Sequence, residues 1–301
     1  MDARPHDAPQ DAGEGPPPSE GPPFEVVRPA RLLTPLVFAS PHSGRVYPAE
    51  MMAASALDAS AIRRSEDAFV DELARAGPAH GAPLITARYA RAYIDVNREP
   101  YELDPAMFED ELPDFARART ARVAAGLGSI ARVVGEGQEI YARKLTFAEA
   151  HRRIEQVHKP YHAALQALIA EAKAKFGLAV LIDVHSMPSA AAEAQRGRRA
   201  LDFVLGDRFG AACAPAVAAL VERELTGMGY AVARNAPYAG GWTTEHYGRP
   251  AERVHALQVE INRALYLDER TLTRRTGFQR LARDLDLLAR ALAAADWSRL
   301  A

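Results

Sequence analysis

The sequence predicts an α/β protein, a three-layer αβα sandwich with a largely parallel or mixed central sheet. Two observations lead to this expectation. Apolar runs of strand length alternate with longer helical patterns from residue 24 onward. Such alternation is typical of helices that cover both faces of a sheet. The 301 residues are 48% hydrophobic, which suffices to bury one large core, so we expect one catalytic domain over residues 24–301.

The individual elements have local signals of their own. Continuous apolar runs predict buried strands at residues 35–40, 178–186 and 256–266. Residues 85–98 alternate as in a strand or hairpin. Helical spacing of apolar residues predicts helices at 65–77 and 271–300.

A long helix is predicted over residues 146–177. Thr146 followed by Glu149 is a capping-box pattern and marks its start. Pro160 lacks the N–H that a helix interior needs, so we expect a kink or break there.

Residues 1–23 are expected to form a disordered, proline-rich tail. They contain seven of the 21 prolines and no aromatic or β-branched residue. Such a segment buries too little apolar surface to offset the entropy lost on ordering.

Composition excludes several classes of function. The net charge of −2 gives no electrostatic basis for binding nucleic acid. Cys213 is the only cysteine, so neither an internal disulfide nor a thiol metal site is expected. No apolar run is long enough to cross a bilayer, and the first residues lack a signal-peptide pattern, so we expect a cytoplasmic protein without a membrane partner.

Two predicted strands each end in a histidine, His42 and His185, followed by serine. Strand ends of α/β sheets are where sites form. Imidazole is the commonest zinc ligand in proteins, and a catalytic zinc site usually has three protein ligands. Either histidine alone fits a satisfied, partly buried side chain. Together they predict a zinc site.

The third ligand is expected to be acidic. Glu66, Asp67 and Asp71 lie at or near a predicted helix start, and helical spacing does not choose among them. Carboxylates in a first helical turn also complement the helix dipole without any chemistry.

Two further stretches carry candidate chemistry. Asn97 and Arg98 end an alternating segment and could anchor an anionic substrate, although a lone arginine is more often solvated. Glu260 lies inside an apolar strand, where a carboxylate needs a partner. It could serve as a general base beside a metal-activated water, or form an ion pair with Arg263.

Seven motifs in order resemble the N-formylglutamate amidohydrolase family over about residues 35–269. They are PHSG, DAFVDEL, YIDVNREP, HKPYH, IDVHSMP, PYAGGWTTEHYGRP and ALQVEINRALY. The resemblance implies the αβα fold of zinc-carboxypeptidase-like, phosphorylase/hydrolase proteins. It also implies hydrolysis of the formamide bond of N-formyl-L-glutamate to formate and glutamate, a step of histidine catabolism.

The resemblance also implies roles for particular residues. It marks His42 and His185 as ligands of one Zn²⁺ and favours Asp67 as the third, through the spacing to Asp71 and Leu73; Glu66 stays as the rival. It implies Glu260 as general base. Substrate contacts are implied for these residues: Asn97, Arg98, Arg153, His162, Gly240 and Gly241. His162 could instead be structural.

One departure concerns the third ligand. Zinc carboxypeptidases place their acidic ligand three residues after the first histidine, where this chain has Arg45. The carboxylate must therefore come from elsewhere in the chain.

Two other functions compete with the first. One is an amidase or deacylase for a different small anionic N-acyl amino acid or a small peptide, because related enzymes often keep the metal site while the substrate pocket diverges. The other is a metal- or ligand-binding protein without turnover, which has little need of a buried base such as Glu260.

Overall fold

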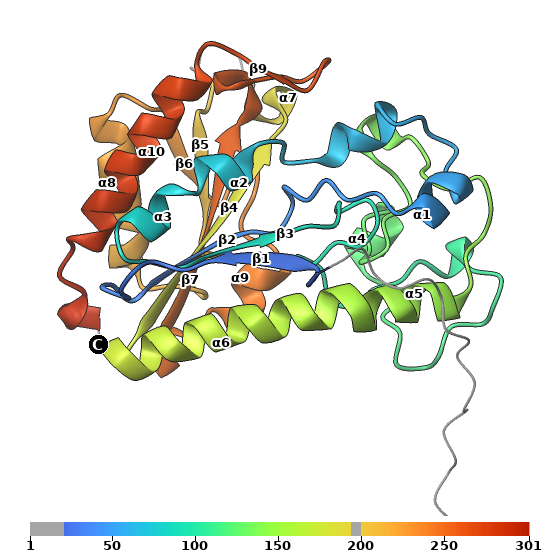
Figure 1. Ribbon diagram of the computed structural model, residues 1–301, viewed down its shortest axis with the longest axis horizontal. Coiled ribbons are helices and arrows are strands. Elements are labelled where there is room, and N and C mark those ends of the chain that lie inside the picture. Colours follow the sequence, from blue (N-terminus) through green and yellow to red (C-terminus); the bar gives the residue numbers. More distant parts are fainter. Residues whose placement is uncertain (1–20, 194–199, 301) are drawn as a thin grey trace, which may run out of the picture.

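A computed structural model of the chain describes residues 21–193 and 200–300, so most of the predicted tail lies outside the described residues. Its centre is a seven-stranded mixed sheet in the order β1-β3-β2-β4-β7-β5-β6 (Figure 1). The strands are β1 (Phe24–Val27), β2 (Leu36–Ser40), β3 (Leu84–Ala87), β4 (Ala179–Met187), β5 (Phe203–Gly206), β6 (Val232–Arg234) and β7 (Val254–Asn262). A separate hairpin joins β8 (Leu267–Asp268) to β9 (Thr273–Arg274).

The central strands β3, β2, β4 and β7 are parallel to one another. β1 and β5 run antiparallel to their neighbours β3 and β7. β4 and β7 pair over nine residues, from Ala179 opposite Val254 to Met187 opposite Asn262, and both strands are buried throughout. Because β2, β4 and β7 are parallel neighbours, their carboxyl ends open at one edge of the sheet.

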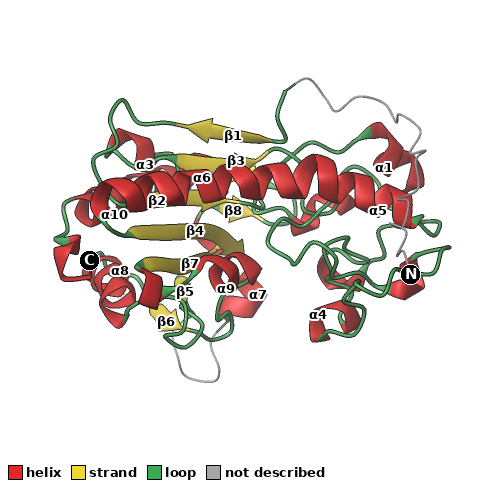
Figure 2. Ribbon diagram, turned by 90° about the horizontal axis from the view of Figure 1, so that it is seen from below, coloured by secondary structure: helices red, strands yellow, loops and turns green. Residues whose placement is uncertain are grey.

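Helices cover both faces of this sheet. Figure 2 shows α6 (Lys159–Phe176) along one face, with α8 (Pro215–Gly227) and α10 (Phe278–Ala293) on the other. Each face of the sheet has its own hydrophobic core, and alternate residues of a strand pack into the two cores. Val37 packs on the α6 side, and Phe38 packs on the side of α8 and α10. Three layers result, and the predicted fold class is confirmed.

The helix predicted at residues 65–77 is wrong. The chain is extended at Glu66, and only two short helices follow, α2 (Val70–Leu73) and α3 (Ala76–Ala79). Phe69 has the left-handed φ of 64°, which interrupts a right-handed helix. The strand or hairpin predicted at 85–98 is likewise confined to β3, and turns follow it.

The long predicted helix is present, with one irregular turn. Its capping box is confirmed, because Thr146 and Glu149 bond each other's backbone N–H at the start of α5 (Phe147–Arg153). A π-helical turn, Ile154–His158, then leads into α6. Lys159 N–H donates to the Ile154 carbonyl five residues back, so the wider turn leaves room for Pro160, which neither kinks nor ends the helix.

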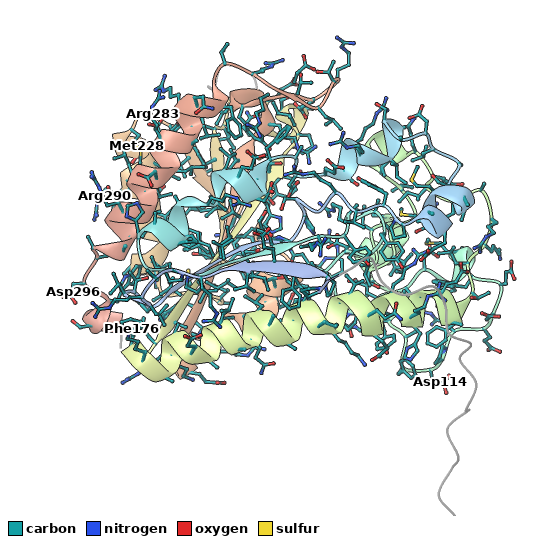
Figure 3. All side chains as sticks on the ribbon, viewed as in Figure 1. Asp114, Phe176, Met228, Arg283, Arg290 and Asp296 are labelled. Atoms are coloured by element: carbon teal, nitrogen blue, oxygen red, sulfur yellow. The ribbon has the colours of Figure 1, made fainter. Side chains whose placement is uncertain are left out.

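No sequence pattern predicted β1, β5, β6 or α8. The remaining α-helices are short: α1 (Ala49–Ala54), α4 (Ala121–Ala124), α7 (Ser189–Ala192) and α9 (Trp242–Tyr247). On α10, which is shorter than predicted, Arg283 and Arg290 are exposed and project away from the layers (Figure 3). Within the described ranges, no helix is long and apolar enough to cross a membrane.

Candidate active site

Three side chains meet where the central parallel strands end. His42 lies two residues past β2, and His185 lies near the end of β4. Asp67 comes from the extended segment before α2, and its N–H donates to the His42 carbonyl over 3.0 Å. This backbone bond fixes the segment against the sheet edge.

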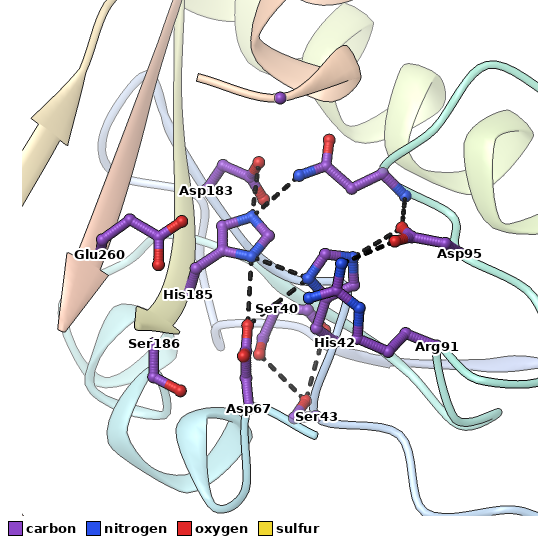
Figure 4. Close-up of polar contacts among 12 residues, drawn as sticks. Ser40, His42, Ser43, Asp67, Arg91, Asp95, Asp183, His185, Ser186 and Glu260 are labelled. Atoms are coloured by element: carbon purple, nitrogen blue, oxygen red, sulfur yellow. Dashed lines mark hydrogen bonds and ion pairs between the residues drawn. The ribbon is translucent and has the colours of Figure 1, made fainter. Parts of the chain in front are cut away.

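The three side chains form a compact cluster suited to a metal ion (Figure 4). His42 Nδ1 and His185 Nδ1 are 3.1 Å apart. Asp67 Oδ2 lies 3.2 Å from His185 Nδ1 and 3.5 Å from His42 Nδ1. All three residues are at most 3% exposed. Two imidazoles and a carboxylate are the ligand types that Zn²⁺ takes in catalytic sites.

The outer nitrogen of each imidazole faces a buried carboxylate. His42 Nε2 lies 2.7 Å from Asp95 Oδ1, and His185 Nε2 lies 3.0 Å from Asp183 Oδ2. Asp183 has no other hydrogen-bond partner among the described residues. A carboxylate in this position holds the proton on Nε2 and leaves the Nδ1 lone pair for a metal.

Of the rival acids, Asp67 joins the cluster and Glu66 does not. Glu66 accepts hydrogen bonds from Arg63 Nε (2.8 Å) and from the Tyr47 hydroxyl (2.7 Å). Asp67 also pairs with Arg263 Nη2 at 3.0 Å. Burial alone would raise the pKa of Asp67, but its contacts with both histidines, together with Arg263, hold that pKa well below its usual range.

Glu260 stands opposite His185 on the neighbouring strand β7, and Figure 4 shows it on the side of His185 away from Arg91. It is 7% exposed. Its Oε1 accepts one hydrogen bond, from Gln258 Nε2 at 2.8 Å. Burial raises the pKa of Glu260, His185 opposes this and Asp67 adds to it, and the resulting pKa is about 7. A carboxylate with this pKa can both accept and return a proton near neutral pH.

The cluster and Glu260 line one cavity of about 690 Å³. Asn97, Arg98, Gly240 and Gly241 line it as well, as the sequence predicted for substrate contact. Asn97 Nδ2 is 3.2 Å from His185 Nε2, and its Oδ1 accepts from Thr243 N–H at 2.8 Å. Gly241 packs on this amide so closely that a Cβ there would lie 2.5 Å from Asn97 Nδ2.

Arg98 has fewer spare donors than its position suggests. Its Nε donates to the Leu127 carbonyl and its Nη1 to the Asn97 carbonyl. Arg91, which sequence reasoning missed, also lines the cavity, and its Nη2 donates to Asp95 at 2.8 Å. Arg91 Nε and Nη1 have no partner among the described residues, so Arg91 is the better-placed donor.

Arg153 and His162 are absent from the described residues that line the cavity. Arg153 is buried, donates to the Tyr93 carbonyl and the Tyr141 hydroxyl, and lies 4.4 Å above the Tyr93 ring. Its guanidinium therefore holds the turn at Tyr93, two residues before Asp95.

His162 and His158 hold the segment that carries Asn97. His162 Nε2 donates to the Val96 carbonyl at 2.7 Å, and His158 Nε2 donates to the Arg98 carbonyl at 2.9 Å. The two carbonyls flank Asn97. Burial lowers the pKa of His158 to about 4, so the ring is neutral near pH 7.

Simple periodicity could have found some of the missed residues. Alternate residues of an extended strand share a face, so Asp183 lies on the same face of β4 as His185. Arg91 and Asp95 lie in turns, where no period applies, and nothing local signals them.

Comparisons with known proteins show the family of this chain. The model of the N-formylglutamate amidohydrolase family matches residues 34–267. A protein of Pseudomonas aeruginosa named N-formylglutamate deformylase is 31% identical over 249 residues, which cover 81% of this chain and 86% of that protein. One of the same name from Pseudomonas putida is 32% identical over 192 residues, covering 63% and 66%.

Solved structures give the same result. An N-formylglutamate amidohydrolase from Ralstonia eutropha superimposes with a TM-score of 0.85 at 43% identity, covering 90% of this chain and 97% of that one. A protein of Agrobacterium tumefaciens shares the fold, with a TM-score of 0.59 at 19% identity over 91% of this chain and 96% of its own.

These matches define an enzyme class, the hydrolases of linear carbon–nitrogen bonds other than peptide bonds. Within it, the chain belongs to the N-formylglutamate amidohydrolase family. The resemblance, fold class and enzyme class expected from the sequence are confirmed.

Proposed function

We propose that this chain hydrolyses the formamide bond of N-formyl-L-glutamate, releasing formate and glutamate. The observation that carries the proposal is the buried Glu260 carboxylate beside the His42–Asp67–His185 cluster in one cavity. The names of the Pseudomonas relatives and of the Ralstonia structure give the substrate.

His42, Asp67 and His185 would hold one Zn²⁺. They fit it because the two Nδ1 atoms and an Asp67 oxygen converge, while Asp95 and Asp183 take the opposite ring nitrogens. A bound zinc ion would supply Lewis acidity toward a water and an acyl oxygen.

Glu260 acts as general base and then as general acid. Its Oε2 has no partner among the described residues, so it can take a proton from the attacking water. The same oxygen then delivers that proton to the leaving amine nitrogen as the carbon–nitrogen bond breaks. A pKa raised to about 7 suits both transfers.

Arg91, Arg98 and Asn97 orient the substrate near the cluster. The α-carboxylate of glutamate is attached to the carbon next to the scissile nitrogen, so it falls close to these groups. Arg91 Nη1 can donate to it while Nη2 stays on Asp95. Gly240 and Gly241 line the cavity beside these groups, and Gly241 lets the backbone pack closely on the Asn97 amide.

Release of the free amino acid from a panel of N-acyl amino acids tests the proposal. Zinc-loaded protein should cleave N-formyl-L-glutamate faster than N-acetyl-L-glutamate or other N-formyl amino acids. Chelation should abolish turnover, and added Zn²⁺ should restore it. Preference for another panel member would assign a different substrate to the same site, and a silent panel from zinc-loaded protein would favour a binding protein.

A further inference from the structure

We infer that Arg208 binds the side-chain carboxylate of the substrate and thereby selects acidic N-formyl amino acids over neutral ones. This inference rests on the proposed function and names the residue that recognises the side chain of the substrate. Arg208 follows β5 and lines the cavity together with the His42–Asp67–His185 cluster.

Several arginines line the cavity, but some of them already donate their hydrogen bonds to protein groups. The arginines on its wall are Arg64, Arg91, Arg98, Arg122, Arg208 and Arg263. Arg263 is fully engaged, because its three nitrogens donate to Ser186 Oγ, the Arg64 carbonyl and Asp67 Oδ1. Arg98 gives two donors to backbone carbonyls.

The substrate has two carboxylates at different distances from the scissile bond. The α-carboxylate belongs near Arg91, which is fixed to Asp95 beside His42. The side-chain carboxylate lies two carbons further along the chain and needs a separate cation. Arg208 and Arg122 supply positive charge at the part of the wall shared with an adjoining surface hollow.

Arg208 keeps donors available on this wall. Its Nη2 pairs with Glu245 Oε2 at 2.9 Å, and the two side chains are 35% and 54% exposed. Such an exposed pair contributes little energy and is readily shared with another anion. Nε and Nη1 of Arg208 have no partner within residues 21–193 and 200–300. Each of them can donate a hydrogen bond to a carboxylate.

The backbone at Arg208 is strained and firmly held. Arg208 and Phe209 have φ values of 55° and 56°, a left-handed conformation that is costly for residues other than glycine. Asn235 Oδ1 accepts from the Asp207 and Phe209 N–H groups, and Asp207 Oδ1 accepts from Gly210 N–H. Four consecutive residues are thereby fixed.

A further bond couples this turn to the cavity wall. Arg208 N–H donates to the Ala239 carbonyl at 2.8 Å, next to Gly240, which also lines the cavity. Strain of this kind persists where the surrounding structure over-determines it, often at ligand contacts. Here it places one cationic side chain at the cavity rather than in solvent.

Three variants test the inference. Arg208→Asn removes the charge and keeps a residue that tolerates a left-handed backbone, so it should fold. Arg208→Lys keeps the charge without the planar fork. Arg117→Gln is the matched control, because Arg117 lines only the adjoining hollow and pairs loosely with Glu99 at 3.5 Å.

The readout is kcat/KM by formate release for N-formyl-L-glutamate and N-formyl-L-glutamine, which differ in charge and hardly in shape. Arg208→Asn should lower kcat/KM for formylglutamate about 30- to 100-fold and leave formylglutamine unchanged. Arg208→Lys should lose about tenfold on formylglutamate alone. Arg117→Gln should match the wild type on both substrates.

Equal losses on both substrates, or an unchanged ratio, would overturn the role of Arg208. Melting curves of both Arg208 variants separate misfolding from lost recognition, and the lysine variant gives a second test of charge. If the wild type cleaves formylglutamate but the ratio stays fixed, this inference alone fails. If the zinc-loaded wild type cleaves no panel member, the proposed function fails first and removes the basis of the inference.

Discussion

The two ends of the cavity are built differently. At the inner end, His42, His185 and Asp67 are at most 3% exposed, and both outer ring nitrogens have a carboxylate partner. At the outer end, the side chains of Arg122 and Arg208 are 32% and 35% exposed and keep spare donors. Groups that perform chemistry need fixed geometry, whereas groups that recognise charge need free donors.

Among substitutions at the inner end, replacing Glu260 should cause the largest loss of activity. Glu260→Gln keeps the shape and can still accept from Gln258, but it cannot take a proton. We expect kcat to fall about 10³-fold on formylglutamate and formylglutamine alike, with zinc content unchanged. Undiminished turnover by zinc-loaded Glu260→Gln would contradict the assignment of the base.

Asp95 should affect zinc affinity through its contact with His42. Asp95→Asn weakens the contact that holds the proton on His42 Nε2 and disturbs the pairing with Arg91. We expect zinc affinity to fall about 10- to 100-fold, measured by competition with a chromophoric chelator.

The matched control for Asp95 is Asp71→Asn. Asp71 forms a more exposed pair with Arg45 away from the cluster. Asp71→Asn should leave zinc affinity unchanged, since exposed ion pairs contribute little free energy. Equal zinc affinity in Asp95→Asn and wild type would show that the Asp95 contact does not tune the ligand.

His158 holds the segment that carries Asn97 through its bond to the Arg98 carbonyl. The buried, neutral ring of His158 should make the free energy of unfolding depend on pH. Burial lowers its folded pKa to about 4 from 6.5, so between these values the unfolded chain takes up a proton that the folded chain does not. This part of the stability is present above pH 6.5 and is lost as pH falls toward 4. We expect wild type to lose about 2 kcal/mol more than His158→Gln between pH 7.5 and pH 5.

Urea denaturation of both proteins at the two pH values measures this difference. Glutamine can still donate to the Arg98 carbonyl but does not titrate, and His162 is common to both proteins. Parallel losses in the two proteins would mean that His158 does not carry this pH dependence.

Substitution of Arg122 should have the smallest effect on catalysis. It tests whether the outer end contributes to binding alone. It lies 3.7 Å from Glu102 and shares the outer wall with Arg208. We expect Arg122→Gln to raise KM for formylglutamate severalfold with kcat unchanged, as for lost uniform binding. A fall in kcat on formylglutamine would instead place Arg122 in the chemistry.

The sequence predicted features that depend on local patterns. The αβα class, the capping box at Thr146 and the strand-end positions of His42 and His185 follow from periodicity and position alone. The third acidic residue of the cluster could not be predicted from periodicity. Residues 65–77 were read as a helix, whereas the left-handed Phe69 and the bond from Asp67 N–H to the His42 carbonyl impose an extended path.

Long-range pairing explains the other differences. Arg98 matched a clamp motif, but two of its donors are taken by carbonyls, one of them at Leu127, 29 residues away. Arg91 lies in a turn without a pattern, and its role depends on Asp95 and on the cavity that distant segments enclose. No window of sequence contains such information.

The π turn at Ile154–His158 sets the rotational phase of the long helix. Before it, α5 buries Arg153 against Tyr93; His158 at its end and His162 on α6 then face the carbonyls beside Asn97. Each residue of an α-helix advances about 100° around the axis. Deleting one residue of the π turn before His158 would keep both imidazoles in the chain yet turn them away from Asn97, so the spacing along this helix is itself part of the site.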